Sequence, residues 1–243
     1  VDHRLEHVLH GNHHFGHGRA LKLNRRHFNA LSLLAAATGS IGSALAQAAA
    51  STASDPAPVV LVVGDSLSAE YGLRRGSGWV ALLAQRLSSQ KMNARVVNAG
   101  VSADTSSGGR SRLPALLRQH QPAVVVIELG ANDALRGLPL SVTRDNLRSM
   151  VRLSREAGAR VLLVGMEMPP NYGQRYAQEF REVFTQVARE EKTALVPFLL
   201  KGVADLEDPT KLFQSDRMHP NESAQPTLLA NVWPALTPLL PKR

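Results

Sequence analysis

The stretch VVLVVGDSLSAEYGL, residues 59–73, runs from five apolar residues into a turn of small polar residues. A continuous β-branched run that stops this abruptly is typical of a strand covered on both faces of a sheet. Ser66 follows Gly64 and Asp65 in the turn. Two interpretations are open at this point: a serine that caps the next helix, or a hydroxyl presented as a nucleophile.

Four more apolar runs follow along the chain, and helical patterns of apolar residues lie between them. The runs are ARVVN (94–98), AVVVIEL (123–129), ARVLLV (159–164) and TALVP (193–197). Helical spacing is clearest over 176–188, and a last helix is expected over about 222–236, with Pro226 delaying its start. This alternation predicts an α/β fold, a three-layer α/β/α sandwich with a five-stranded parallel sheet.

Composition narrows the class of protein. The chain has 243 residues, 44% of them hydrophobic, which suits one domain with a sizeable core. It has no cysteine, so disulfides and thiolate metal sites are excluded. The net charge is +8, but basic residues are interspersed with acidic ones and lack interleaved aromatic residues. We therefore expect no nucleic-acid partner, whereas contact with an anionic lipid surface stays open.

The chain's first part predicts export. Residues 1–46 are expected to be a leader and signal peptide of twin-arginine-like type, because Arg25 and Arg26 precede an uncharged apolar stretch with small residues at 44–46. The mature protein is then periplasmic or secreted. The alternative is an uncleaved membrane anchor, against which the shortness of the apolar stretch argues.

The remaining domain boundaries follow from local composition. Residues 47–58 are predicted to be a linker, and 59–243 the folded domain. Six of the nine histidines lie in 1–23. Metal binding by that tract is an alternative, but irregular spacing defines no coordination geometry, so we predict no metal site and no cofactor.

Acyl transfer needs a hydroxyl, a base, a carboxylate that orients the base, and donors to the oxyanion. Beyond the leader only His120 and His219 remain, and His120 lies in a polar helix end before a proline. Asp216, three residues before His219, can orient that imidazole toward Ser66. A backbone N–H of Ser66 at a helix start, an N–H of the 100–104 loop and the Asn132 amide are candidate oxyanion donors.

Each of these residues also has a structural interpretation. Asn132 can be a turn residue, Asp216 and His219 can belong to a surface loop, and Asp65 is expected to brace the turn. Together they supply every role in acyl transfer, at predicted carboxyl ends of strands or in one late loop. The joint pattern favours a catalytic site.

Four sequence blocks carry a family resemblance: GDSLSAEYGL, NAGVSADTS (98–106), GAND (130–133) and DRMHPN (216–221). Their order and spacing resemble the SGNH (GDSL-motif) hydrolases, and residues 59–240 are similar to the exported arylesterase, acyl thioesterase and lysophospholipase branch. The resemblance implies a flavodoxin-like SGNH hydrolase fold. It also implies catalytic and oxyanion-hole residues, which are Ser66, Asp216 and His219 for the triad and Ser66, Ala103 and Asn132 for the hole.

Two positions depart from the family pattern. Ala103 stands where the family has a glycine, and an alanine with positive φ there would cost about 1 kcal/mol. Arg217 replaces a small residue between Asp216 and His219. The exchange at 217 either reshapes the mouth of the site or attracts an anionic substrate.

We therefore expect a monomeric serine esterase that cleaves small hydrophobic aryl or acyl esters through an acyl-enzyme, with thioesters and lysophospholipids as further candidate substrates. Apolar side chains of 134–142 and 166–176 either contact the acyl group or pack against helices. Two alternatives are a carbohydrate O-deacetylase on the same fold and a non-catalytic exported binding module.

Overall fold

The computed structural model describes residues 56–241. The predicted leader and signal peptide (1–46) and residues 47–55 of the predicted linker lie outside this range, so those boundaries stay predictions. Among the described residues, no helix is both long and apolar enough to span a membrane.

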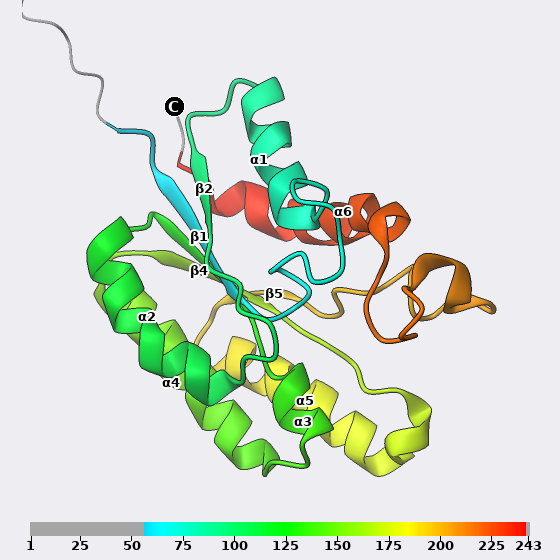
Figure 1. The fold of residues 1–243 in the computed structure, drawn as a ribbon. Coiled ribbons are helices and arrows are strands. Elements are labelled where there is room, and N and C mark those ends of the chain that lie inside the picture. Colours follow the sequence, from blue (N-terminus) through cyan, green and yellow to red (C-terminus); the bar gives the residue numbers. More distant parts are fainter. Residues whose placement is uncertain (1–55, 242–243) are drawn as a thin grey trace, which may run out of the picture. The chain divides into compact units, whose positions relative to one another are not determined.

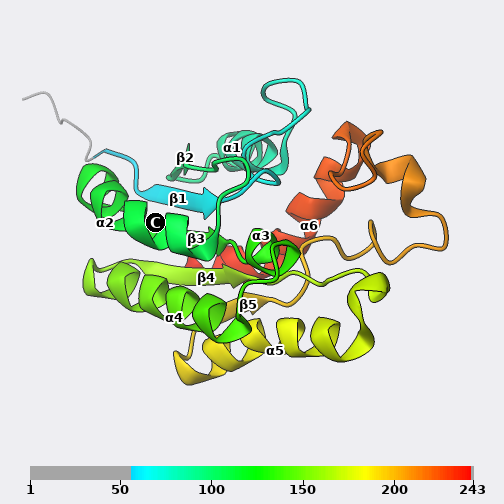
Figure 2. The ribbon, with the colours of Figure 1, turned by 60° about the horizontal axis from the view of Figure 1, so that its bottom comes forward.

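Five parallel strands form one sheet in the order β2-β1-β3-β4-β5 (Figures 1 and 2). Their bounds are β1 Val59–Gly64, β2 Arg95–Asn98, β3 Val124–Glu128, β4 Arg160–Val164 and β5 Ala194–Val196. Every residue of β1 and β3 is buried, which explains why their apolar runs are continuous instead of alternating. The predicted five-stranded parallel sheet is confirmed.

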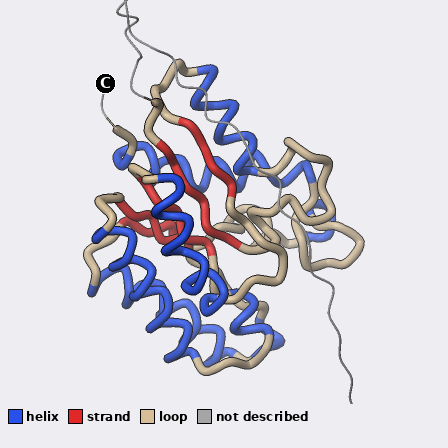
Figure 3. Tube along the Cα trace, turned by 60° about the vertical axis from the view of Figure 1, so that its left-hand side comes forward, coloured by secondary structure: helices blue, strands red, loops and turns tan. Residues whose placement is uncertain are grey.

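Helices cover both faces of the sheet (Figures 1 and 3). One layer contains α1 and α6, which contact each other, and the other contains α2, α4 and α5 in that order. Their bounds are α1 Trp79–Ser89, α2 Ser106–His120, α3 Ala131–Leu135, α4 Leu140–Glu156, α5 Gln174–Glu190 and α6 Gln225–Leu236. Short 3-10 helices lie at Pro170–Tyr172, Pro209–Leu212, Glu222–Ala224 and Thr237–Leu239.

The helices bury the faces that the sequence periodicity predicts. On α5, Phe180, Val183, Phe184 and Val187 are buried, and the rings of the two phenylalanines meet edge to face at 5.2 Å. The last helix is delayed as expected. Glu222–Ala224 forms a 3-10 turn before α6 begins, and a proline stands in the first turn of α6.

The direction of the connections changes at β1 and β3. From β1 the chain crosses through α1 to β2 on one side, and from β2 it crosses through α2 to β3 on the other side of β1. The helices of the two connections lie on opposite faces of the sheet, so the loops that follow the paired strands β1 and β3 diverge at their carboxyl ends. Doubly wound sheets with this strand order bind ligands at that point.

Candidate active site

Ser66 lies two residues beyond the end of β1. The Asp65 side chain accepts a hydrogen bond from the Leu67 N–H at 3.0 Å, and the Asp65 carbonyl accepts from the Ala69 N–H at 2.9 Å. Asp65 thus braces the turn, as predicted. The expected helix start at Ser66 is wrong, because the chain continues through turns and α1 begins only at Trp79. The turn's own hydrogen bonds stabilise this segment without a helix. The Glu70 carboxylate adds to them by accepting the N–H groups of Gly76 and Gly78.

His219 reaches Ser66 from a loop late in the chain. Its Nε2 lies 3.0 Å from Ser66 Oγ, and its Nδ1 lies 2.6 Å from Asp216 Oδ2. The other carboxylate oxygen of Asp216 accepts the backbone N–H groups of Met218 and His219 at 2.9 and 3.0 Å. The structure therefore brings together all three residues that the sequence selects for the triad.

The Asp216 carboxyl is held in its ionised form. Partial burial opposes ionisation, but the backbone hydrogen bonds from His219 and Met218, with the His219 side chain, outweigh it and lower the pKa to about 2. A carboxylate at this position can orient the imidazole and stabilise it when it becomes charged.

The loop that carries Asp216 and His219 is closed on itself. Gln214 donates its N–H to the His219 carbonyl at 2.8 Å, Asn221 donates to the Leu212 carbonyl at 2.8 Å, and Phe213 forms an isolated bridge with Pro220.

The closed loop is also attached to the segment that carries Ser66. The Gln214 side-chain amide donates to the Tyr71 carbonyl at 2.8 Å. Gly72 has φ 69°, and a Cβ there would lie 2.0 Å from Gln214 Oε1, so a larger residue would be strained and would displace the Gln214 side chain. Further along, the Trp79 N–H donates to the Gln225 side chain at 3.0 Å. These contacts hold the histidine at its distance from the serine.

The two remaining oxyanion candidates follow the strands on either side of β1. Ala103, beyond β2, has φ 63°, which is the left-handed conformation expected for the family's glycine. Asn132, on α3 beyond β3, donates through Nδ2 to the Asp104 carbonyl at 2.9 Å and to Asp65 Oδ2 at 3.1 Å. Asn132 is thus joined to the residue after Ala103 and to the residue before Ser66.

Two buried carboxyl groups lie behind the turn that carries Ser66. Glu128, at the end of β3, accepts hydrogen bonds from Ser68 Oγ at 2.8 Å and from the Asp65 N–H at 3.3 Å. Burial, reinforced by the nearby Asp65, raises the pKa of Glu128 well above 4.5. Burial also raises the pKa of Asp65 to about 6, against the hydrogen bond from Leu67. Glu128 is not among the site residues predicted from sequence, although a carboxyl in the run AVVVIEL is a visible signal.

The rim of the site combines exposed apolar groups with a strained backbone position. The Tyr71 ring lies 4.5 Å from the His219 ring, and Tyr71 and Met218 are each about half exposed. Arg217 has φ 55°, so the family's small residue at this position also corresponds to left-handed backbone. Within residues 56–241, no group of three or more His, Asp or Glu side chains is arranged to hold a metal ion.

Comparison with known proteins identifies the family of this chain. A model of the GDSL-like lipase/acylhydrolase family matches residues 62–225. The chain belongs to this family. It is 54% identical to esterase TesA of Pseudomonas aeruginosa over 184 residues, which cover 76% of this chain and 90% of that protein.

A second relative and a solved structure extend the comparison. The chain is 40% identical to the thioesterase 1/protease 1/lysophospholipase L1 of Escherichia coli over 184 residues, covering 76% of this chain and 86% of that protein. The crystal structure of TesA matches with a TM-score of 0.72 at 54% identity, covering 75% of this chain and 99% of that one. The predicted SGNH hydrolase fold and enzyme class are confirmed, and the chain is an ester hydrolase.

Proposed function

We propose that this ester hydrolase acts through an acyl-enzyme on Ser66, with His219 as general base and Asp216 as the carboxylate that orients it. One observation carries the proposal: Ser66 Oγ, His219 Nε2, His219 Nδ1 and Asp216 Oδ2 form a continuous chain with separations of 3.0 and 2.6 Å. A hydroxyl attacks an acyl carbon only when a base receives its proton, and this arrangement supplies the base.

In the first half-reaction, Ser66 Oγ attacks the ester carbonyl carbon while its proton passes to His219 Nε2. The carbonyl oxygen becomes an oxyanion, which the N–H groups of Ser66 and Ala103 and the Asn132 amide stabilise. The bond from carbon to the leaving oxygen then breaks, and His219 returns the proton to that oxygen. In the second half-reaction, water attacks the acyl carbon while His219 takes its proton. The bond from that carbon to Ser66 Oγ then breaks, His219 returns the proton to Oγ, and the acid leaves.

The proposed substrates are carboxylic esters of small hydrophobic aryl or acyl groups, with thioesters and lysophospholipids in the same range. Support comes from the half-exposed Tyr71 and Met218 at the rim, which offer apolar contact beside His219. The names of the relatives, which include an esterase and a thioesterase/lysophospholipase, point to the same chemistry. A series of p-nitrophenyl esters of increasing acyl length tests the substrate class.

A fluorophosphonate probe tests the nucleophile. We expect stoichiometric labelling of the protein and none of Ser66→Ala. Ser89→Ala, which changes a serine at the end of α1, is the matched control and should label like the parent. Labelling of a folded Ser66→Ala variant would refute the assignment, and a parent protein that turns over only acetylated sugars would favour the O-deacetylase alternative.

Export remains part of the proposal. We infer that residues 1–46 direct the chain out of the cytoplasm and are removed, leaving 47–58 as a linker before the catalytic domain. Sequencing the amino terminus of the mature protein from the producing cell tests it. A mature chain that still contains Arg25 and Arg26 would contradict cleavage.

A further inference from the structure

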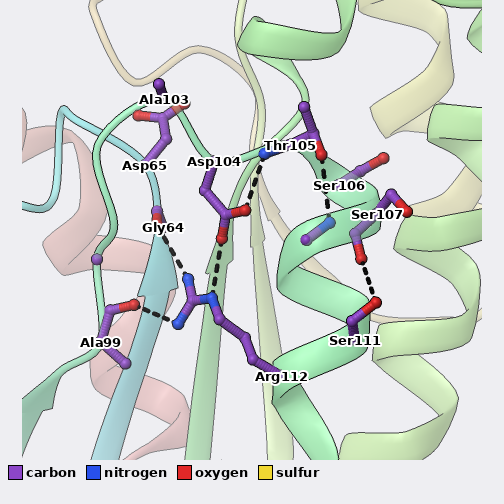
Figure 4. A network of polar contacts seen from close by, with 12 residues as sticks. Gly64, Asp65, Ala99, Ala103, Asp104, Thr105, Ser106, Ser107, Ser111 and Arg112 are labelled. Atoms are coloured by element: carbon purple, nitrogen blue, oxygen red, sulfur yellow. Dashed lines mark hydrogen bonds and ion pairs between the residues drawn. The ribbon is translucent and has the colours of Figure 1, made fainter. Parts of the chain in front are cut away.

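Arg112 on α2 donates to three acceptors in two segments of the chain, the end of β1 and the loop between β2 and α2 (Figure 4). Its Nε lies 2.8 Å from Asp104 Oδ2, its Nη1 lies 2.6 Å from the Ala99 carbonyl, and its Nη2 lies 3.3 Å from the Gly64 carbonyl. Because a guanidinium is planar and rigid, these three bonds fix the acceptors relative to one another.

The three acceptors flank the groups that act in the proposed mechanism. The Gly64 carbonyl ends β1, two residues before Ser66, and the Ala99 carbonyl follows the end of β2. Asp104 directly follows Ala103. One side chain therefore connects the segment of the nucleophile to the segment of an oxyanion donor.

The segment around Ala103 depends on such support because its backbone is strained. Ala103 has φ 63°, which an alanine adopts only against a steric cost. Asp104 is the point of attachment: its side chain pairs with Arg112, and its carbonyl accepts from Asn132 Nδ2 at 2.9 Å. The other carboxylate oxygen of Asp104, Oδ1, accepts the Thr105 N–H at 3.0 Å.

We propose that Arg112 is a positioning residue for ester hydrolysis: through Gly64 and Asp104, it sets the distance between Ser66 and the Ala103 N–H. Arg112 itself does not touch the substrate. The inference rests on the proposed function, since it assumes that an oxyanion forms between these two groups. A lysine has one charged nitrogen and cannot reproduce the three-way contact.

Steady-state kinetics of Arg112→Gln and Arg112→Lys on a p-nitrophenyl ester test the proposal. We expect kcat to fall roughly 100-fold in Arg112→Gln, because a small misplacement of reacting groups is costly. KM should stay within about threefold, since only transition-state stabilisation is lost. Arg112→Lys should fall in between, and Arg118→Gln, an exposed arginine on the same helix, should match the parent.

Chemical rescue separates positioning from folding. Added methylguanidinium should restore part of kcat in Arg112→Ala, whereas neutral methylurea at the same concentration should not. If Arg112→Gln does not fold, kcat of Arg112→Lys tests the proposal instead, and thermal denaturation shows whether that variant is folded. A folded Arg112→Lys variant with the parent's kcat, or a loss confined to KM, would overturn the proposal.

The rate of fluorophosphonate labelling distinguishes this inference from the function on which it rests. The phosphonyl oxygen occupies the oxyanion position, so we expect slower labelling of Arg112→Gln than of the parent and Arg118→Gln. Equal rates for all three would overturn the role of Arg112 and leave the proposed nucleophile intact. A parent protein that is not labelled at all would overturn both.

Discussion

His219 Nε2 lies 3.0 Å from Ser66 Oγ, although 153 positions separate the two residues in the sequence. A base at this distance accepts the proton only in its neutral form. We expect the pH profile of kcat/KM to have an acid limb, along which kcat/KM rises with pH, because only the neutral base can take the Ser66 proton. Asp216 does not produce this limb, because its pKa lies at about 2.

Asp65 is the competing source of such an ionisation, since its pKa is raised to about 6. Measuring the pH profile of Asp65→Asn separates the two groups. The limb should persist in this variant at a lower plateau, because the change disturbs the contact with Asn132. If the limb disappears with Asp65, the assignment of His219 as the titrating base is wrong.

Asn132→Ala should raise the activation barrier for acylation by about 3 kcal/mol, the usual effect of removing one oxyanion donor. In the free enzyme both protons of Nδ2 already point to Asp65 and Asp104, so one of these bonds must weaken when the oxyanion forms. Stopped-flow acylation measures the rate, and urea denaturation measures the accompanying stability loss, expected at about 1 kcal/mol.

Asn231→Ala is the matched control for this change. Asn231 Nδ2 also donates to two carbonyls, those of Leu199 and Lys201, both at 2.8 Å. It should lose comparable stability while keeping its rate. If the acylation rate of Asn132→Ala falls less than tenfold below the parent's, Asn132 is not an oxyanion donor.

Ala103→Gly should stabilise the protein by about 1 kcal/mol, because glycine adopts the left-handed conformation without a steric cost. Ala115→Gly, at an exposed position within α2, should instead lower the free energy of unfolding by about 0.5–1 kcal/mol. Thermal or urea denaturation of both variants measures the opposite signs. Two changes of the same sign would show that residue 103 carries no backbone strain.

Glu128→Gln should change how stability depends on pH. Because the folded-state pKa of Glu128 is raised above 4.5, its stabilising contribution is complete below that pH and is lost as pH rises through the higher folded value. Glutamine resembles the neutral acid and still accepts the bonds from Ser68 and Asp65. The variant should therefore gain stability relative to the parent as pH increases.

Urea denaturation at several pH values between 4.5 and 8 measures this difference. Glu182→Gln, an exposed glutamate on α5, controls for the change in net charge. A constant gap between Glu128→Gln and the parent across this range would mean that the buried group titrates alike in the folded and unfolded chains.

The features predictable from sequence are those that leave a local pattern. The buried β-branched runs such as VVLVV identify the strands, and the polar residues after them identify Ser66 and Asn132 as neighbours at one sheet edge. The scarcity of histidine beyond the predicted leader identifies His219 and, three residues earlier, Asp216, and the family blocks add Ala103.

The missed features depend on distances between remote segments. Arg112 resembles any arginine on a polar helix face, because its three acceptors are brought to it only by folding. The turn after Ser66 looks like a helix start, because the contacts that replace the helix come from Glu70 and from distant Gln214. Glu128 is visible as a lone charge, but its partners are not.

The loop from Leu212 to Asn221 closes through its own backbone hydrogen bonds, and the Asn221 side-chain amide adds one to the Lys211 carbonyl at 2.7 Å. Within the described part of the chain, residues 202–207, which come earlier in the connection from β5, form only local hydrogen bonds and none with this loop. Insertions or deletions in 202–207 would therefore alter the surface beside the proposed catalytic centre while leaving the His219 imidazole in place, so substrate preference can vary there independently of the chemistry.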